Sequence, residues 1–152
     1  MIQNIAFGFG DISRLLRKRF DAAARGIGLT GAQWRVLIAV SKNPGMNQGQ
    51  LAERLEVEPI TVCRMIDRME QAGLVERRAD PQDRRARLLY PAANAADLIV
   101  RLEELGRELM DTLTCDLDEA DLEILSRTMA RIRNKLLDDT AFPPREAGRG
   151  RG

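Results

Sequence analysis

The stretch that decides the fold runs from residue 47 to residue 90 and reads NQGQLAERLEVEPITVCRMIDRMEQAGLVERRADPQDRRARLLY. Its first residues form a capping box, because Asn47 can cap a helix and Gln50 stands at the third helical position. After this short helix and a break, Pro59 is well suited to begin a second, longer helix. That helix is expected to stop at Gly73, which can adopt a left-handed conformation. A short helix, a turn and a longer helix predict a helix-turn-helix.

Two short runs with strand character follow the second helix. Residues 74–78 (LVERR) and 87–90 (RLLY) flank a polar segment, ADPQDRR, whose proline and aspartates favour a tight reversal. A hairpin placed directly after a helix-turn-helix is a wing. Although the net charge of the whole chain is only +1, basic residues are concentrated here: Arg77, Arg78, Arg84, Arg85 and Arg87.

Apolar residues recur at steps of three and four outside this central stretch, which predicts further amphipathic helices. The first helix should end near Gly26 or Gly28, and a capping box of Thr30 and Gln33 should begin the next one. Asp118 is expected to cap the last helix. The stripes are Ile5, Phe9, Ile12, Leu16, Phe20 and Ala23 before the centre, and Leu98, Leu102, Leu105, Leu109, Leu113 and then Leu122, Leu125, Met129, Ile132 and Leu136 after it.

These patterns predict a mainly α fold with a winged helix-turn-helix core and a two-stranded wing. The terminal stripes hold more apolar surface than such a core can cover, so a second copy of the chain is the expected partner, with a monomeric helical bundle as the alternative. We therefore expect dimerisation helices at 1–28 and 92–141 around a winged helix-turn-helix domain at 29–91. Residues 142–152, rich in glycine, proline and arginine, are expected to be a disordered tail.

The composition argues against catalysis and against a membrane protein. Of the 152 residues, 44% are hydrophobic and 31% charged, there is no histidine, and the two cysteines make neither a disulfide framework nor a zinc site. Neither a phosphate loop nor a nucleophile elbow is present, so we expect no enzymatic activity, no cofactor and no metal. The longest aliphatic run, residues 36–40, is far shorter than the ~20 residues that cross a bilayer, and no secretory signal is seen. The expected location is the cytoplasm.

The second helix of the helix-turn-helix carries a polar face suited to the major groove of duplex DNA. Thr61, Arg64 and Arg68 recur at steps of three and four, opposite an apolar stripe. An ordinary solvated face is the alternative interpretation of this pattern. We expect base contacts near the start of this helix and phosphate contacts from the supporting helix. The predicted DNA-binding residues are Gln48, Gln50, Pro59, Ile60, Thr61, Arg64, Arg68, Arg77, Arg84, Arg85 and Arg87.

With its parts in this order, the chain resembles the MarR family (multiple antibiotic resistance regulators) over nearly its whole length. The resemblance is carried by LAERL at 51–55, RMIDRMEQAGLV at 64–75 and DPQDRR at 80–85. It implies a homodimeric transcription regulator, by default a repressor, that binds a pseudo-palindromic site and places Arg85 in the minor groove. The chain departs from the family pattern at Cys63, where threonine is frequent, and at residues 91–95, where Leu-Thr-x-x-Gly is usual.

The resemblance also implies a small-molecule effector, often a phenolic or carboxylated aromatic compound or its thioester, that releases DNA. The family's usual pocket lies where the first, second and fifth helices meet the winged core. Mapped onto this sequence, the candidates are Ser13, Arg14, Arg17, Gln33 and Trp34. Each also has a plain structural interpretation, since Trp34 can be a hydrophobic staple and the arginines can face solvent.

Two further functions are weighed against this interpretation. Cys63 or Cys115 could serve a redox-responsive regulator, although cysteines in such positions are more often small apolar fillers. A winged-helix module used only for protein assembly would need neither Arg64 nor an arginine-rich wing. Both features therefore favour DNA binding.

Overall fold

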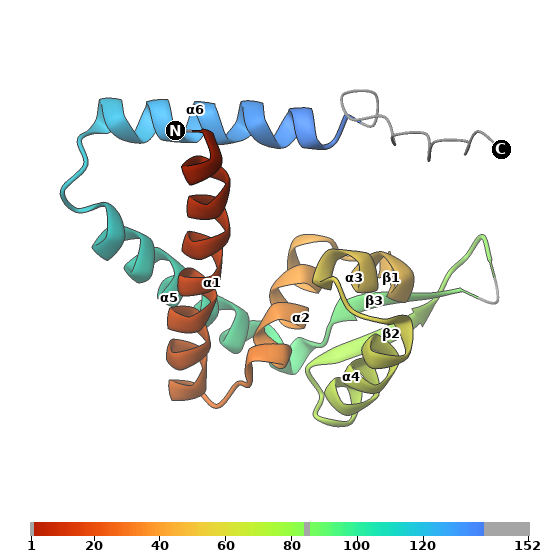
Figure 1. Ribbon diagram of the computed structural model, residues 1–152. Coiled ribbons are helices and arrows are strands. Elements are labelled where there is room, and N and C mark those ends of the chain that lie inside the picture. Colours follow the sequence, from red (N-terminus) through yellow and green to blue (C-terminus); the bar gives the residue numbers. More distant parts are fainter. Residues whose placement is uncertain (1, 84–85, 139–152) are drawn as a thin grey trace, which may run out of the picture. The chain divides into compact units, whose positions relative to one another are not determined.

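The computed structural model describes residues 2–83 and 86–138. Over these residues helices alternate with a few short strands (Figure 1). The predicted disordered tail lies outside the described residues. The elements are α1 (Ile2–Gly26), α2 (Gly31–Lys42), β1 (Met46–Asn47), α3 (Gln48–Leu55), α4 (Pro59–Gln71), β2 (Val75–Ala79), β3 (Arg87–Pro91), the 3-10 turn η1 (Ala93–Ala95), α5 (Ala96–Thr114) and α6 (Glu119–Leu136).

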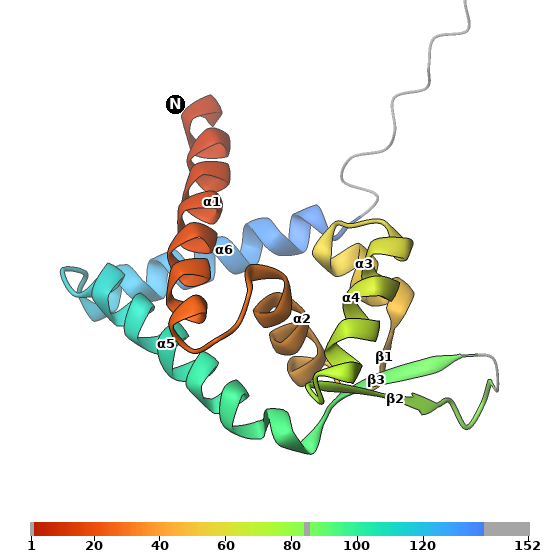
Figure 2. The ribbon, with the colours of Figure 1, turned by 90° about the horizontal axis from the view of Figure 1, so that it is seen from below.

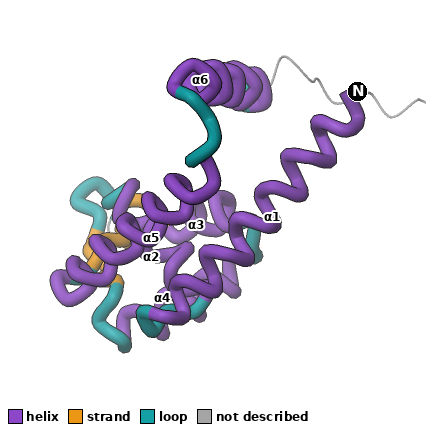
Figure 3. Tube along the Cα trace, turned by 90° about the vertical axis from the view of Figure 1, so that its left-hand side faces the viewer, coloured by secondary structure: helices purple, strands orange, loops and turns teal. Residues whose placement is uncertain are grey.

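The chain divides into two compact units, residues 1–109 and 110–152. The first unit holds α1, the winged helix-turn-helix and most of α5, and the second holds the end of α5 and α6. The division of the chain into a DNA-binding domain and dimerisation helices stays a prediction. Figure 3 shows that strands occupy only a small part of the described chain and that helices form most of it.

The core of the first unit is built from one face of each of its helices. In α4 the predicted stripe of Val62, Ile66 and Met69 is buried, as the helical period requires. The largest fully buried side chains come from α2, α3, α4, the sheet and α5. They are Val36, Leu37, Val40, Leu51, Val62, Ile66, Met69, Val75, Leu89 and Leu102. The core therefore fixes α4 and the sheet in one body, with α2 and α3 packed beside them (Figure 1).

The predicted helix starts are confirmed. Thr30 and Gln33 form a reciprocal capping box, as do Asn47 and Gln50, whose two hydrogen bonds are each 2.9 Å long. At α6, the Asp118 carboxylate accepts a hydrogen bond from the backbone N–H of Asp121 at 2.8 Å. These bonds satisfy amide groups that a helix otherwise leaves unpaired at its first turn.

The predicted wing hairpin is confirmed, but the sheet has a third strand that the sequence did not predict. β3 lies in the middle and pairs antiparallel with both β1 and β2, in the order β1-β3-β2. Leu89 is opposite Met46 on one side and Arg77 on the other. β1 has only two residues, too few to show the alternating pattern that marks a strand. Figure 2 shows the β2–β3 hairpin extending past α4.

The terminal helices differ in how much of their apolar stripe is covered. The end of α1 packs on the core, where Phe20 lies against Trp34 with ring centroids 4.4 Å apart. Earlier in α1, Ile5, Phe9 and Ile12 are exposed, and α6 has no buried residue. Among the described residues, no helix is both long and apolar enough to cross a membrane.

Candidate nucleic-acid interface

The outer face of α4 carries the side chains that the sequence assigned to base contacts. Pro59, Ile60, Thr61 and Arg64 are all exposed, and they lie within the first two turns of the helix. Pro59 occupies the first helical position, where its missing N–H costs nothing. The buried stripe on the opposite face holds α4 against the core. The helix therefore presents a fixed face to solvent, on which Thr61 and Arg64 are polar.

The two arginines of this face differ in their surroundings. In the part of the chain that the structure describes, Arg64 makes no hydrogen bond or ion pair, so its guanidinium is available to a ligand. Arg68, one turn further on, lines a small pocket of about 160 Å³ with residues of α2 and α4. The other lining residues are Thr30, Ala32, Gln33, Met65 and Met69.

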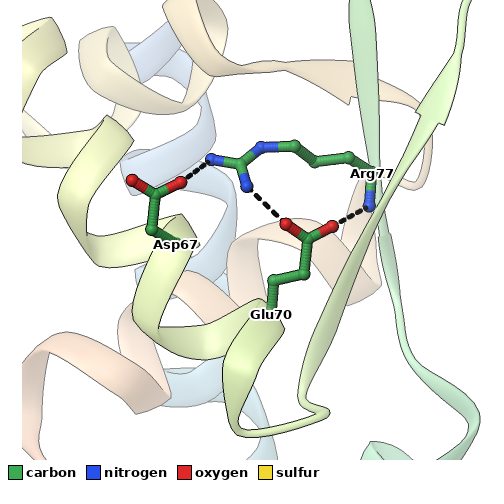
Figure 4. Close-up of polar contacts among 3 residues, drawn as sticks. All are labelled: Asp67, Glu70 and Arg77. Atoms are coloured by element: carbon green, nitrogen blue, oxygen red, sulfur yellow. Dashed lines mark hydrogen bonds and ion pairs between the residues drawn. The ribbon is translucent and has the colours of Figure 1, made fainter.

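The side chain of Arg77 lies along α4 and pairs with two of its carboxylates (Figure 4). Its Nη2 donates to the Asp67 carboxylate at 2.6 Å, and its Nη1 donates to Glu70 at 2.5 Å. The backbone N–H of Arg77 donates to the other oxygen of Glu70 at 3.2 Å. One arginine on β2 thus joins the wing to two carboxylates of α4, and its side chain is only 17% exposed.

The charge on Arg77 is stabilised by these partners. Burial lowers the pKa of Arg77, but the hydrogen bonds and charges of Asp67 and Glu70 outweigh burial and raise that pKa above the usual arginine value. A raised pKa means that the pairing stabilises the fold below this value and is lost only as pH rises through it. This geometry does not support the predicted DNA contact from Arg77, because both of its terminal nitrogens are already engaged.

The remaining wing arginines are Arg78, Arg84, Arg85 and Arg87, of which the structure describes Arg78 and Arg87. Arg78 pairs with Glu76 and lies over the ring of Tyr90, 4.2 Å from the ring centroid. Arg87 is exposed at the start of β3. The predicted minor-groove contact, Arg85, and its neighbour Arg84 lie outside the described residues. Their assignment to DNA stays a prediction.

The two glutamines assigned to phosphates have different local roles. The side-chain oxygen of Gln50 accepts a hydrogen bond from the backbone N–H of Asn47, so Gln50 serves the helix cap. Gln48 is half-buried, and among the described residues its side-chain nitrogen has no hydrogen-bond partner. Because this nitrogen is buried, it is not exposed to a phosphate in this conformation.

Among the described residues, two of the candidate effector residues, Arg14 and Gln33, line different hollows. Arg14 forms an exposed ion pair with Asp11 and lines an open groove on α1, whereas Gln33 lines the small pocket that also contains Arg68. Ser13 and Arg17 are exposed on α1. Their role in ligand binding stays a prediction.

Trp34 has a partner that the sequence analysis did not identify. Its indole Nε1 donates to the Asp21 carboxylate at 2.7 Å, which links α1 to α2. Gly31 makes room for this contact, since a Cβ at Gly31 would lie 2.7 Å from the same Asp21 oxygen. The spacing of 13 residues between Asp21 and Trp34 gives no local signal for the bond.

Comparison with known proteins agrees with this geometry. A sequence model described as MarR family matches residues 27–86, which hold the helix-turn-helix and most of the wing. The part of the chain that this model matches, residues 27–86, is a winged helix-turn-helix of the MarR type. Proteins of this family are transcription regulators rather than enzymes.

Two relatives illustrate the sequence similarity of this chain to known transcriptional regulators. It is 25% identical over 133 residues to an uncharacterized HTH-type transcriptional regulator, YybA, of Bacillus subtilis (strain 168), covering 88% of this chain and 89% of the relative. It is 27% identical over 106 residues to the transcriptional regulator HosA of Escherichia coli O111:H-, covering 70% and 78%.

Solved structures share the fold over most of the chain. The transcriptional regulator PA3341 has a TM-score of 0.79 and 27% identity, with 88% of this chain and 98% of that chain covered. A cysteine variant of MarR from E. coli, complexed with operator DNA, has a TM-score of 0.71 and 22% identity, with 86% and 94% covered. The winged helix-turn-helix fold is thus confirmed.

Proposed function

We propose that this protein is a homodimeric repressor of the MarR family that binds a pseudo-palindromic operator in duplex DNA. The observation that carries the proposal is the exposed face of α4, where Arg64 has no partner among the described residues while the opposite face is buried in the core. An unpaired arginine on a rigid helix can form the bidentate bond to guanine that is the commonest specific contact in the major groove.

Other described residues would support α4 in this role. Thr61 and Pro59 are exposed beside Arg64. Gln48, at the first turn of α3, would contact a phosphate oxygen after its buried side-chain nitrogen turns outward. Arg85 is proposed to enter an A·T-rich minor groove, whose narrow walls concentrate negative potential. The relative whose structure contains operator DNA has the same fold, which supports the assignment.

The proposed dimer is supported by uncovered apolar surface on the terminal helices. Phe7 of α1 is 79% exposed, and Leu136 of α6 is 68% exposed. Such surface is costly in a monomer and is typical of an interface. A two-fold dimer presents two copies of α4, so the half-sites should lie about one helical turn apart, or about 10 base pairs.

Operator binding is tested first with DNA from the region beside the protein's own gene, titrated at several salt concentrations. We expect tight binding with a steep salt slope, since phosphate contacts release counterions. Arg64→Ala and Arg85→Ala should each weaken specific binding by at least tenfold. The matched control is Arg101→Ala, which removes an exposed arginine from α5. If neither this region nor a randomised duplex pool yields a specific site, the proposal is wrong.

Release by a small aromatic acid is the second part of the proposal, supported by the family resemblance and by the exposed guanidinium groups on α1. Benzoate and phenol are suitable probes, with cyclohexanecarboxylate as the non-aromatic control. Benzoate or phenol should raise the melting temperature of the free protein and lower its affinity for operator. Arg17→Ala should abolish the effect of benzoate on both. If neither probe changes the melting temperature or the operator affinity, release by an aromatic compound is contradicted, whereas operator binding is not.

A further inference from the structure

Ile60 is an apolar side chain in an unusual place. Among the described residues between Leu16 and Ile99, it is the only large hydrophobic side chain that is exposed, with 61% of its surface open to solvent. It occupies the second position of α4, directly after Pro59. All other large hydrophobic residues of the described winged core are buried or half-buried.

Ile60 does not belong to the buried face of α4 or to the hydrophobic pair at the start of this helix. The buried face of the helix is supplied by Val62, Ile66 and Met69. The hydrophobic pair expected around a helix start falls on Val57 and Val62, which are half-buried and buried. Ile60 contributes to neither set. As a β-branched residue, it also lowers helix propensity slightly.

Ile60 shares its face of α4 with the unpaired Arg64. The two residues are four apart, so their side chains are neighbours on the helix surface. The first turn of a recognition helix is the part that approaches base edges most closely. In the major groove, the one apolar group on a base edge is the methyl group of thymine, and an aliphatic side chain can pack against it.

We propose that Ile60 is a specificity-determining residue that packs against a thymine methyl group in each half-site. The inference rests on the proposed function and adds the identity of a base. One helical turn rises about 5.4 Å and successive bases along one strand lie about 3.4 Å apart, so this thymine should lie one or two base pairs from the guanine bound by Arg64.

The test removes the methyl group from the DNA and the side chain from the protein in a double-mutant cycle. A high-affinity duplex is first selected from a randomised pool with the wild-type protein. Each thymine of the selected half-sites is then replaced by deoxyuridine, which lacks only the methyl group. We expect that replacing one particular thymine in each half-site lowers the affinity of the wild-type protein by about fourfold. This is the loss that follows when one buried methyl group is removed.

The variant Ile60→Ala should bind the thymine and deoxyuridine duplexes equally, whereas Ile60→Val should keep part of the discrimination. Val100→Ala, which shortens an exposed side chain on α5, is the control and should discriminate as the wild type does. Because Ile60 is exposed, the thermal unfolding of Ile60→Ala should match the wild type. Equal discrimination by wild type and Ile60→Ala, with specific binding intact, would overturn the inference and leave the proposed function standing. Failure to select any specific duplex would refute both.

Discussion

At the scale of a residue, Arg77 joins the wing to the recognition helix through one guanidinium. Its removal leaves Asp67 and Glu70 close together without their shared cation. We expect Arg77→Ala to lower the free energy of unfolding by about 1–2 kcal/mol. The effect is smaller than for a fully buried ion pair, because both carboxylates are half-exposed and solvent screens their charges. Arg77→Lys, which cannot donate in the same fork, should lie between wild type and alanine. Urea unfolding followed by circular dichroism measures both.

Measurements of DNA binding distinguish two roles for Arg77: holding the wing in position and contacting a phosphate. If Arg77 positions the wing, Arg77→Ala should weaken operator binding and leave the salt slope of the remaining contacts unchanged. If it contacts a phosphate, the slope should fall by about one for each copy, with unfolding unaffected. The second pattern would contradict the positioning role.

Gly31 carries a second prediction at this scale. Alanine is a better helix former than glycine by about 1 kcal/mol, yet at Gly31 a Cβ would lie 2.7 Å from the Asp21 oxygen that accepts the Trp34 hydrogen bond. We expect Gly31→Ala to displace Asp21 and lower the melting temperature. Gly26→Ala is the matched control, because a Cβ there meets no atom within 4 Å. Equal melting temperatures for the two variants would show that Asp21 moves at no cost.

At the scale of an element, the start of α3 depends on the reciprocal cap of Asn47 and Gln50. Asn47→Ala should lower the free energy of unfolding by about 1 kcal/mol, because it removes the acceptor for a first-turn amide. Asn47→Asp keeps an acceptor and favours the positive end of the helix dipole, so unfolding should match the wild type. Operator binding by Asn47→Asp should nevertheless weaken, since the new charge lies beside Gln48 and its proposed phosphate. If Asn47→Asp binds operator with the wild-type affinity, no DNA phosphate lies beside Gln48.

The elements show which features a sequence can predict. Capping boxes, the buried stripe of α4 and the wing hairpin were predicted because each is encoded by residues a few positions apart. β1 was missed because two residues form a strand only through pairing with β3, more than 40 positions later. The pairing of Arg77 with α4 was missed for a similar reason, since an arginine in a basic run has the same sequence pattern whether it faces DNA or a carboxylate.

At the scale of the whole molecule, the exposed stripe of α6 is where dimerisation can be tested. Leu125 and Met129 are 45% and 51% exposed at the middle of this helix. A carboxylate at either position would be desolvated in an interface, so Leu125→Glu and Met129→Glu should shift the protein from dimer to monomer in analytical ultracentrifugation. Arg127→Glu places a carboxylate away from the stripe and should leave the dimer intact.

Operator affinity should follow the oligomeric state of these variants. Two copies of α4 held in one dimer make the second half-site contact intramolecular, which raises affinity by a factor of about 10² to 10⁴ over a single copy. A monomeric Leu125→Glu protein should therefore lose about that much affinity for the full operator and show almost no preference for it over an isolated half-site. The wild-type melting temperature should also rise with protein concentration, because association stabilises the folded dimer by mass action. A monomeric wild type that binds its operator tightly at the same concentration would contradict the proposed dimer, because a single copy of α4 would then account for the affinity.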